Sequence, residues 1–175
     1  ASRGLGAGLA ARWAEAGLRL GLAARTEPAA PQGAEALTAS VDVSDAEAVE
    51  RFGAAVVERF GPIDLWVNNA GLLEPFAPLR DADPAALRAN LEVNVLGVLY
   101  GSAIYARHVR SRDGGGVLVN ITSGAATSAY AGWAAYCGSK AAVDQITRVV
   151  VEEEIDTGLR RGADPEGRGQ GRVGA

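Results

Sequence analysis

The sequence predicts a doubly wound α/β domain, in which helices cover a parallel sheet. Short apolar runs alternate with longer amphipathic runs along most of the chain, a pattern typical of βα units. A glycine-rich turn over residues 1–6 comes directly before a helical pattern, as in domains that hold a pyrophosphate at a helix N-terminus. The length of 175 residues, the 48% hydrophobic content and the net charge of −4 fit one soluble globular domain.

Each expected element has a local signal. Leu5, Leu9 and Trp13 recur at helical spacing, and Gly17 suits the end of that helix because glycine readily adopts a positive φ. Ser44 or Asp45 can cap the next helix, since either side chain can accept hydrogen bonds from backbone N–H groups. The expected helices span residues 5–17, 45–60, 84–110 and 136–154, and the expected strands span residues 18–23, 37–41, 63–67 and 117–122.

The two ends of the chain depart from this pattern. A doubly wound domain starts with a central strand, whereas this chain opens on the glycine turn that should follow one. Residues 157–175 contain 6 Gly and 4 Arg and almost no large apolar residue, which indicates a disordered tail. We therefore expect a domain over residues 1–156 that lacks its first strand and its C-terminal strands and lid. Because a missing central strand leaves two neighbours without ladder partners, we expect the chain as written to be unstable or inactive.

Composition excludes several classes of function. Cys137 and His108 are the only cysteine and histidine, so neither a disulfide framework nor a Cys/His zinc site can form, and no metal is expected. The scarcity of cysteine is also typical of a reducing cytoplasm. The net charge of −4 argues against a nucleic-acid partner, and no apolar run is continuous enough to predict a membrane span.

One pair of side chains indicates acid–base chemistry. Tyr136 and Lys140 lie four residues apart in a predicted helix and therefore share one face. Lys140 is the only lysine among 17 basic residues. A fixed ammonium near a phenol stabilises the phenolate and lowers the pKa of the tyrosine, which suits a general acid or base near neutral pH. The alternative is an accidental pair on an ordinary helix surface.

Several further motifs occur together with this pair. They are Ala-Ser-Arg-Gly-Leu-Gly at residues 1–6, Asp42-Val43, Asn68-Asn69-Ala70-Gly71, Asn94, Ser123 and Tyr136-x-x-x-Lys140. In order and spacing they resemble the short-chain dehydrogenase/reductase family over about residues 1–154. Residues 121–126 and 132–137 further resemble the branch of sepiapterin and benzil reductases. The resemblance implies a Rossmann-like fold and hydride transfer between a nicotinamide cofactor and a carbonyl or alcohol.

The resemblance also implies a role for each catalytic residue. Tyr136 would be the general acid that protonates the carbonyl oxygen, and Ser123 would hydrogen-bond the same oxygen. Lys140 would lower the pKa of Tyr136 and hold the nicotinamide ribose hydroxyls, and Asn94 would position a water that links Lys140 to solvent. Two alternatives stay open, because Ser123 can cap its loop and Asn94 can be a satisfied buried amide.

Arginine residues favour NADP over NAD as the cofactor. Where an NAD-binding domain usually presents a carboxylate after its second strand, this chain has Arg25, and Arg3 lies in the glycine turn. Both guanidinium groups suit a 2′-phosphate, although arginines are scattered along the whole chain. Asp42 resembles the family's adenine-contacting aspartate and can instead cap a helix. The residues expected to bind the cofactor are Ser2, Arg3, Gly4, Gly6, Arg25, Asp42, Val43, Asn69, Ala70, Gly71, Tyr136 and Lys140.

The expected partners follow from this assignment. The substrate is a small carbonyl or alcohol compound, and Tyr130 and Trp133 can line an apolar pocket for a flat or aromatic one or can simply pack their loop. If the full domain is present, the resemblance suggests a homodimer or homotetramer. The alternative function is a catalytically inactive fragment, or a cofactor-sensing protein without enzymatic activity, on the same fold.

Overall fold

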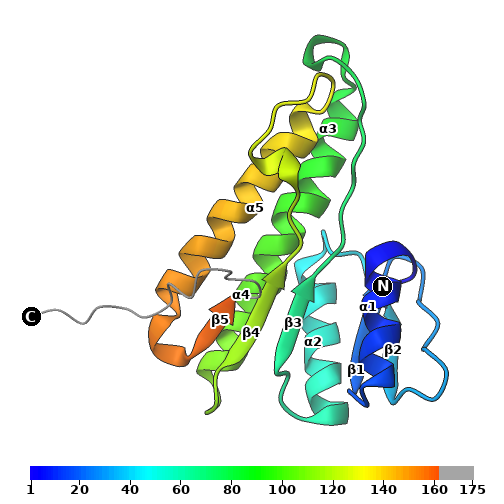
Figure 1. Cartoon of the computed structure of the whole chain (residues 1–175), viewed down its shortest axis with the longest axis vertical. Helices are drawn as coiled ribbons and strands as arrows, with labels where there is room; N and C mark the ends of the chain where they lie inside the picture. The colour runs from blue at the N-terminus through cyan, green and yellow to red at the C-terminus, as the bar shows by residue number, and fades with distance from the viewer. Residues whose placement is uncertain (162–175) are drawn as a thin grey trace, which may run out of the picture.

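The computed structural model of the protein describes residues 1–161, which form five parallel strands with helices between them (Figure 1). The predicted α/β class is therefore confirmed. The strands are β1 (Leu20–Ala24), β2 (Ala36–Ser40), β3 (Leu65–Asn68), β4 (Gly116–Asn120) and β5 (Leu159–Arg161). The longer helices are α1 (Gly4–Glu15), α2 (Ala46–Phe60), α3 (Pro84–Leu91), α4 (Gly97–Arg110) and α5 (Ala134–Glu153). A π-helical segment, η2 (Glu92–Leu96), joins α3 to α4, and short 3-10 turns are η1 (Leu79–Asp81), η3 (Gly124–Ala126) and η4 (Ile155–Thr157).

The helix ends follow the capping rules that the sequence indicates. Asp45, and not Ser44, caps α2, because its Oδ1 accepts a hydrogen bond from the backbone N–H of Ala48 at 3.0 Å. α1 is followed by Gly17, whose φ of +76° is a conformation that side-chain-bearing residues rarely adopt. These local signals place the predicted helices within a few residues of their observed bounds.

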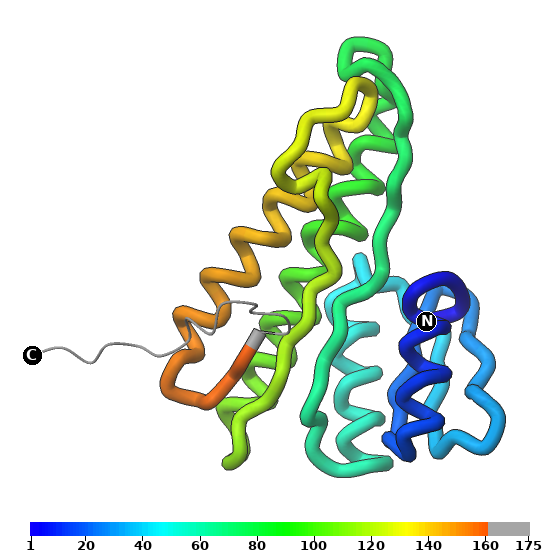
Figure 2. The backbone as a smooth tube through the Cα atoms, viewed as in Figure 1, coloured from blue at the N-terminus to red at the C-terminus, as the bar shows by residue number. Residues whose placement is uncertain are grey.

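The predicted helix over residues 84–110 is interrupted. α3 and α4 continue one another only through the π-helical turn η2, which contains the buried Asn94. Figure 2 shows this long helical stretch running alongside α5 and extending beyond the strands. A π turn inserts one extra residue into a helix, and this changes the direction in which nearby side chains point. Helical periodicity alone does not reveal such an insertion.

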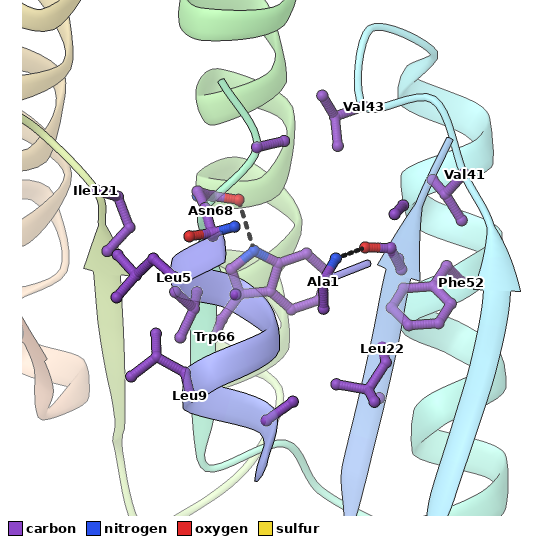
Figure 3. A pocket seen from close by; sticks show the side chains of 18 of the residues that line it. Ala1, Leu5, Leu9, Leu22, Val41, Val43, Phe52, Trp66, Asn68 and Ile121 are labelled. Atoms are coloured by element: carbon purple, nitrogen blue, oxygen red, sulfur yellow. Dashed lines mark hydrogen bonds between the residues drawn. The ribbon is translucent and has the colours of Figure 1, made fainter. Parts of the chain in front are cut away.

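The five strands form two separate parallel sheets. β1 pairs with β2, and β4 lies between β3 and β5. Within residues 1–161 no ladder joins β1 to β3, which agrees with the expectation that two strands lack a ladder partner between them. A cavity of about 1380 Å³ separates these two strands. Its apolar lining includes Leu9 of α1, Leu22 of β1, Phe52 of α2 and Trp66 of β3 (Figure 3).

β5 corrects the prediction of a disordered tail from Thr157 onward. Leu159 pairs with Gly116 and is only 4% exposed, in a core cluster with Tyr105, Val109 and Leu118. The strand was missed because it is short and carries a single large apolar residue, whose burial depends on partners distant in sequence. The rest of the predicted tail, residues 162–175, lies outside the described residues.

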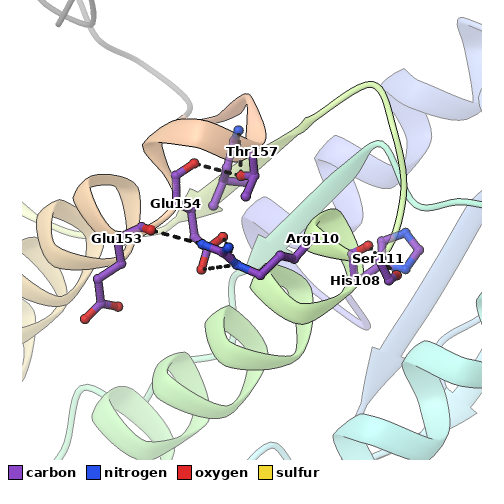
Figure 4. A network of polar contacts seen from close by, with 7 residues as sticks. His108, Arg110, Ser111, Glu153, Glu154 and Thr157 are labelled. Atoms are coloured by element: carbon purple, nitrogen blue, oxygen red, sulfur yellow. Dashed lines mark hydrogen bonds and ion pairs between the residues drawn. The ribbon is translucent and has the colours of Figure 1, made fainter. Parts of the chain in front are cut away.

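An ion pair fixes the turn that leads into β5. Arg110 of α4 donates from Nε to Glu154 Oε2 at 3.0 Å and from Nη2 to the carbonyl oxygen of Glu153 at 3.2 Å (Figure 4). The Thr157 hydroxyl donates to the carbonyl oxygen of Glu154 at 2.7 Å. Arginine pairs of this kind, with the carboxylate largely shielded from water, are stronger than exposed ones. The end of α5 is therefore attached to α4 and is not a freely solvated helix end.

Within residues 1–161, no helix combines the length and apolar character needed to cross a bilayer.

Candidate active site

The predicted pair Tyr136 and Lys140 lies on the first two turns of α5, one turn apart. The Lys140 Nζ atom is 5.7 Å from the centroid of the Tyr136 ring and donates a hydrogen bond to the carbonyl oxygen of Ile121 at 2.7 Å. Lys140 is only 4% exposed, and this burial lowers its pKa, while Asp144 acts in the opposite direction. The ammonium is thus held in a fixed position beside the phenol, which argues against an accidental surface pair.

Ser123 follows β4 and starts the short turn η3. Its Oγ accepts a hydrogen bond from the backbone N–H of Ala125 at 3.2 Å. The loop-capping alternative is therefore realised. The bond uses the oxygen only as an acceptor, so the hydroxyl hydrogen can still be donated to a substrate oxygen.

Asn94 is a satisfied buried amide, the second alternative that the sequence left open. Its Oδ1 accepts from the backbone N–H of Leu72, and its Nδ2 donates to the carbonyl oxygen of Leu72, both at 2.7 Å. Nδ2 also contacts Asn90 Oδ1 at 3.1 Å and Ser139 Oγ at 3.0 Å. These contacts occupy both amide hydrogens, so the side chain fixes a loop. Oδ1 keeps a second lone pair that can accept a hydrogen bond from a water, and the water-positioning role of Asn94 stays a prediction.

Asn90 and Ser139 extend this network, and sequence reasoning missed both. Each is 0% exposed. Asn90 Nδ2 donates to the carbonyl oxygens of Leu72 and Glu74, and the Ser139 hydroxyl donates to the carbonyl oxygen of Tyr136 at 2.8 Å. A continuous hydrogen-bonded chain therefore joins the loop at residues 72–74 to the helix that carries Tyr136. The available signal was spacing, because Asn90 stands four residues before Asn94.

Every residue predicted to bind the cofactor lines one cavity. It is the cavity between the two sheets, and the structure brings to it Ser2, Arg3, Gly4, Gly6, Arg25, Asp42, Val43, Asn69, Ala70, Gly71, Tyr136 and Lys140. Asn94 and Ser123 are not among its lining residues. The fold therefore brings together, around this cavity, segments that are distant in sequence: the glycine turn, the ends of β1, β2 and β3, and the start of α5.

Two glycines at this cavity face the side-chain nitrogens of other candidate residues. A Cβ at Gly6 would lie 2.7 Å from Asn69 Nδ2, and one at Gly71 would lie 3.7 Å from Lys140 Nζ. The first distance is shorter than real Cβ contacts, so a side chain at position 6 would require the Asn69 side chain to shift. In dinucleotide-binding domains, glycines at the N-terminus of the first helix let the backbone approach the pyrophosphate closely.

The charged side chains that line the cavity include the carboxylates of Asp42 and Asp64 and three exposed arginines, Arg3, Arg19 and Arg25. Hydrogen bonds from the hydroxyl and the backbone N–H of Ser44 lower the pKa of Asp42, and the positive charge of Arg25 lowers it further. Arg3 and Arg25 are both exposed. Among residues 1–161, no group of three or more His, Cys, Asp or Glu side chains is placed to hold a metal ion.

The parallel sheets, the glycine turn before α1 and the cavity at the ends of the strands are features of a dinucleotide-binding α/β fold. The chain matches the short chain dehydrogenase family over residues 1–162, and it belongs to this family. It is 32% identical to 3beta-hydroxysteroid dehydrogenase 2 of Eggerthella lenta over 98% of this chain and 69% of that protein. It is 36% identical to the benzil reductase ((S)-benzoin forming) of Bacillus subtilis over 58% of this chain and 42% of that protein. The predicted resemblance to benzil reductases is confirmed.

Solved structures give the same result for the fold. An alcohol dehydrogenase from Thermococcus sibiricus, complexed with 5-hydroxy-NADP, superposes with a TM-score of 0.81 at 30% identity, covering 91% of this chain and 71% of that one. An NADH-dependent reductase responsible for alginate metabolism superposes with a TM-score of 0.82 at 27% identity, covering 91% and 71%. The chain thus spans between 42% and 71% of the length of these four proteins.

Proposed function

We propose that this chain carries the catalytic site of an oxidoreductase that interconverts a carbonyl and an alcohol with NADP as its cofactor. The observation that carries the proposal is the buried Lys140 beside Tyr136, at a cavity lined by all the residues expected to hold the cofactor. Family membership supports a nicotinamide-dependent dehydrogenase or reductase in general. The roles of individual residues and the choice of NADP are our own inferences.

The chain's own residues account for the proton transfer. Tyr136 donates its phenolic proton to the carbonyl oxygen, and the new O–H bond forms as the phenol O–H bond breaks. The Lys140 ammonium stabilises the resulting phenolate, which then regains a proton from solvent. Ser123 donates a hydrogen bond to the same substrate oxygen and fixes its position. When bound, the cofactor supplies the hydride that reaches the carbonyl carbon and is itself oxidised.

The residues present fit such a cofactor. The glycine turn at the start of α1 offers backbone N–H groups to a pyrophosphate, and Gly6 permits the close approach of Asn69. Arg25 follows β1 and, with Arg3, would pair with a 2′-phosphate, which is the argument for NADP over NAD. One structural relative is complexed with an NADP derivative and another is named NADH-dependent, so the preference rests on these two charges.

Self-association through the long helices is part of the same proposal. Leu96 of η2, Leu99 of α4 and Val149 of α5 are large apolar residues with 37%, 40% and 43% of their surface exposed. Contact with a second copy would remove this surface from water. A homodimer or homotetramer is the assembly that we expect, and a cytoplasmic location is the expectation that fits the composition.

The experiment that tests the function combines cofactor binding with turnover. NADPH binding is followed by tryptophan-to-nicotinamide energy transfer, and turnover by NADPH oxidation with a panel of diketones and aryl ketones. Tyr136→Phe removes the proton donor, so we expect turnover to fall by about 10²- to 10⁴-fold while NADPH still binds. Tyr100→Phe, on α4, is the matched control and should retain activity.

Each outcome has a defined meaning. Equal activity of Tyr136→Phe and the unchanged chain would contradict the catalytic assignment. Tight NADPH binding without turnover would favour a cofactor-sensing protein, and loss of both binding and turnover would favour an inactive fragment. Tighter binding of NADH than of NADPH would overturn the cofactor preference alone.

A further inference from the structure

β1 and β3 each have one edge that no strand covers. Within residues 1–161, β1 pairs only with β2, and β3 pairs only with β4 on this side of the second sheet. On the paired edges, the Leu20 N–H donates to the carbonyl oxygen of Glu35 at 2.9 Å, and the Asn68 carbonyl oxygen accepts from the N–H of Ile121 at 3.0 Å. Backbone groups alternate between the two edges of a strand, so the intervening residues direct their N–H and C=O groups away from these ladders.

The residues whose backbone groups point away from the ladders are Gly21 and Ala23 of β1 and Leu65 and Val67 of β3, which we call the open-edge residues. All four line the cavity between the two sheets. One of their oxygens already accepts a hydrogen bond, because the Ala1 ammonium donates to the carbonyl oxygen of Ala23 at 2.6 Å (Figure 3). The open edge of β1 can therefore accept a bond from a main-chain nitrogen inside the cavity. Backbone groups in an apolar space are costly to leave unpaired.

The space between the two open edges, which we call the strand slot, is apolar on both of its faces. Leu22 of β1 packs with α1, whereas a Cβ at Gly21 would lie 2.6 Å from Val56 of α2, so the two helices cover opposite faces of β1. Leu5 lines the slot from α1, and Phe52 lines it from α2 (Figure 3). Strands of a parallel sheet that are covered by helices on both faces carry apolar side chains in both directions.

The strand slot and the expected cofactor residues occupy different parts of the cavity. A Cβ at Gly6 would lie 2.7 Å from Asn69, just after β3, and 3.2 Å from Ala1, which contacts Ala23 of β1. The carboxyl ends of β1 and β3 therefore lie together, at the glycine turn. The strand slot continues from there along both strands. The cavity volume of about 1380 Å³ exceeds the roughly 300–1,000 Å³ of ordinary small-molecule sites, which leaves room for a second occupant.

We propose that the strand slot binds an extended apolar segment of a partner polypeptide, which adds to both open edges as a parallel strand. β1 has five residues and β3 has four, so a segment of about five residues matches the slot. An apolar small molecule would fill the space but leave the backbone groups of both edges unpaired. A peptide backbone supplies donors and acceptors at ladder spacing, as in other cases of strand addition. This inference goes beyond the proposed function and does not depend on it.

The test uses a synthetic peptide of five valine and isoleucine residues, preceded by two lysines for solubility and labelled with fluorescein at its amino end. Binding is followed by fluorescence anisotropy in the absence of NADPH and ketone, so failure of the proposed function does not affect the result. We expect saturable binding of one peptide per chain. At a peptide concentration of 100 Kd, Tm should rise by roughly 5–10 °C, because the peptide binds the folded chain and not the unfolded one.

A second peptide separates ladder formation from simple apolar contact. It carries N-methyl groups on two adjacent residues, which removes one donor toward each open edge and keeps every apolar side chain. We expect its Kd to be at least about 10-fold higher, since two hydrogen bonds are lost and the methyl groups meet the strand edges.

A variant of the chain tests the position of the slot. Leu5→Asp places a carboxylate in the slot and should raise Kd for the first peptide at least about 10-fold. The free chain should tolerate this change, because Leu5 is 56% exposed and an acidic residue suits the first turn of a helix. Leu79→Asp is the matched control, since Leu79 is 63% exposed and does not line the cavity.

Hydrogen exchange measured by NMR shows whether the peptide lies in the ladder. The amide protons of the open-edge residues should exchange at least about 10-fold more slowly when the first peptide is bound. The amide protons of Leu22 and Trp66 point toward β2 and β4 and serve as internal controls, whose exchange should change less.

Four results would overturn the proposal. They are no binding of the first peptide, equal binding of the N-methylated peptide, equal binding to Leu5→Asp, and unchanged exchange at the open-edge residues. Binding that occurs only when the peptide is fused ahead of Ala1 would also overturn it, because the proposed occupant is a separate polypeptide.

Discussion

Replacing Asn90 with leucine tests whether the buried amide network holds the loop beside the candidate active site. Asn90 Nδ2 donates to the carbonyl oxygens of Leu72 at 3.0 Å and Glu74 at 2.7 Å, and Asn90 Oδ1 accepts from Asn94 Nδ2 at 3.1 Å. Leucine is similar in size and shape, so Asn90→Leu removes three hydrogen bonds without leaving a large cavity. The change therefore isolates the polar contribution.

The loss of stability in Asn90→Leu depends on which hydrogen-bond partners of Asn90 keep another hydrogen bond. The Leu72 oxygen retains Asn94 Nδ2, and Asn94 Nδ2 retains Ser139 Oγ. The Glu74 oxygen loses its donor. A lost hydrogen bond costs about 1 kcal/mol and an unsatisfied buried group about 1–3 kcal/mol, while the added apolar surface offsets part of this. We expect the free energy of unfolding to fall by about 2–4 kcal/mol, which corresponds to a decrease in Tm of roughly 5–15 °C.

Urea and thermal unfolding followed by circular dichroism measure this change. Arg88→Ala on the same helix is the control: the Arg88 side chain is 79% exposed, and its loss should cost less than about 0.5 kcal/mol. Asn90→Asp provides a second check, because a carboxylate would face two carbonyl oxygens. It should be more destabilising than Asn90→Leu at pH 7 and less so near pH 4, where the protonated carboxyl can donate one bond. A Tm for Asn90→Leu within about 1 °C of the unchanged chain would refute the reasoning.

Two further predictions concern Lys140 and His108. Lys140→Arg keeps the positive charge but replaces a compact ammonium with a bulky planar group at a 4% exposed position, so NADPH oxidation should fall by at least about 100-fold; retained activity would contradict its role. His108 Nε2 accepts a hydrogen bond from the N–H of Ile63 at 2.9 Å, and burial, chiefly, lowers the pKa of His108. The contribution of His108 to the free energy of unfolding should therefore be fully present above about pH 6.5. It should decline as the pH falls below this value, because the histidine binds a proton more readily in the unfolded chain. In His108→Gln, urea midpoints measured at pH 7.5 and pH 5.5 should differ less than in the unchanged chain.

Local spacing was sufficient to predict much of the fold and of the proposed site. The pattern from Tyr136 to Lys140 spans only five residues, and the observed pair lies on one face of α5 as expected. Caps such as Asp45 are likewise local, because donor and acceptor lie within one helical turn. Features determined within about five residues are the ones that sequence reasoning recovers.

Features that depend on distant partners were missed. Leu159 is buried by Tyr105, Val109 and Leu118, which lie 41 or more positions earlier in the sequence, so the tail-like composition around it hid a strand. Nothing in the sequence around Asn90 distinguishes it from an ordinary helical residue. Only the folded chain shows that its amide donates hydrogen bonds to backbone carbonyl oxygens of a loop. A buried polar residue and an exposed one cannot be distinguished by residue type alone.

The proposed site has two parts, because its residues belong to two separate sheets and the helices packed on them. Asp42 and Arg25 belong to the β1–β2 side of the cavity, whereas Tyr136 and Lys140 lie on α5, which packs against the β3–β4–β5 sheet. The second part is held by short hydrogen bonds, from Lys140 to the Ile121 oxygen and from Ser139 to the Tyr136 oxygen. No ladder joins the two sheets within residues 1–161. The geometry of the proposed proton transfer would therefore be set locally on one side, while affinity for the proposed cofactor would depend on how the two sides are placed across the cavity.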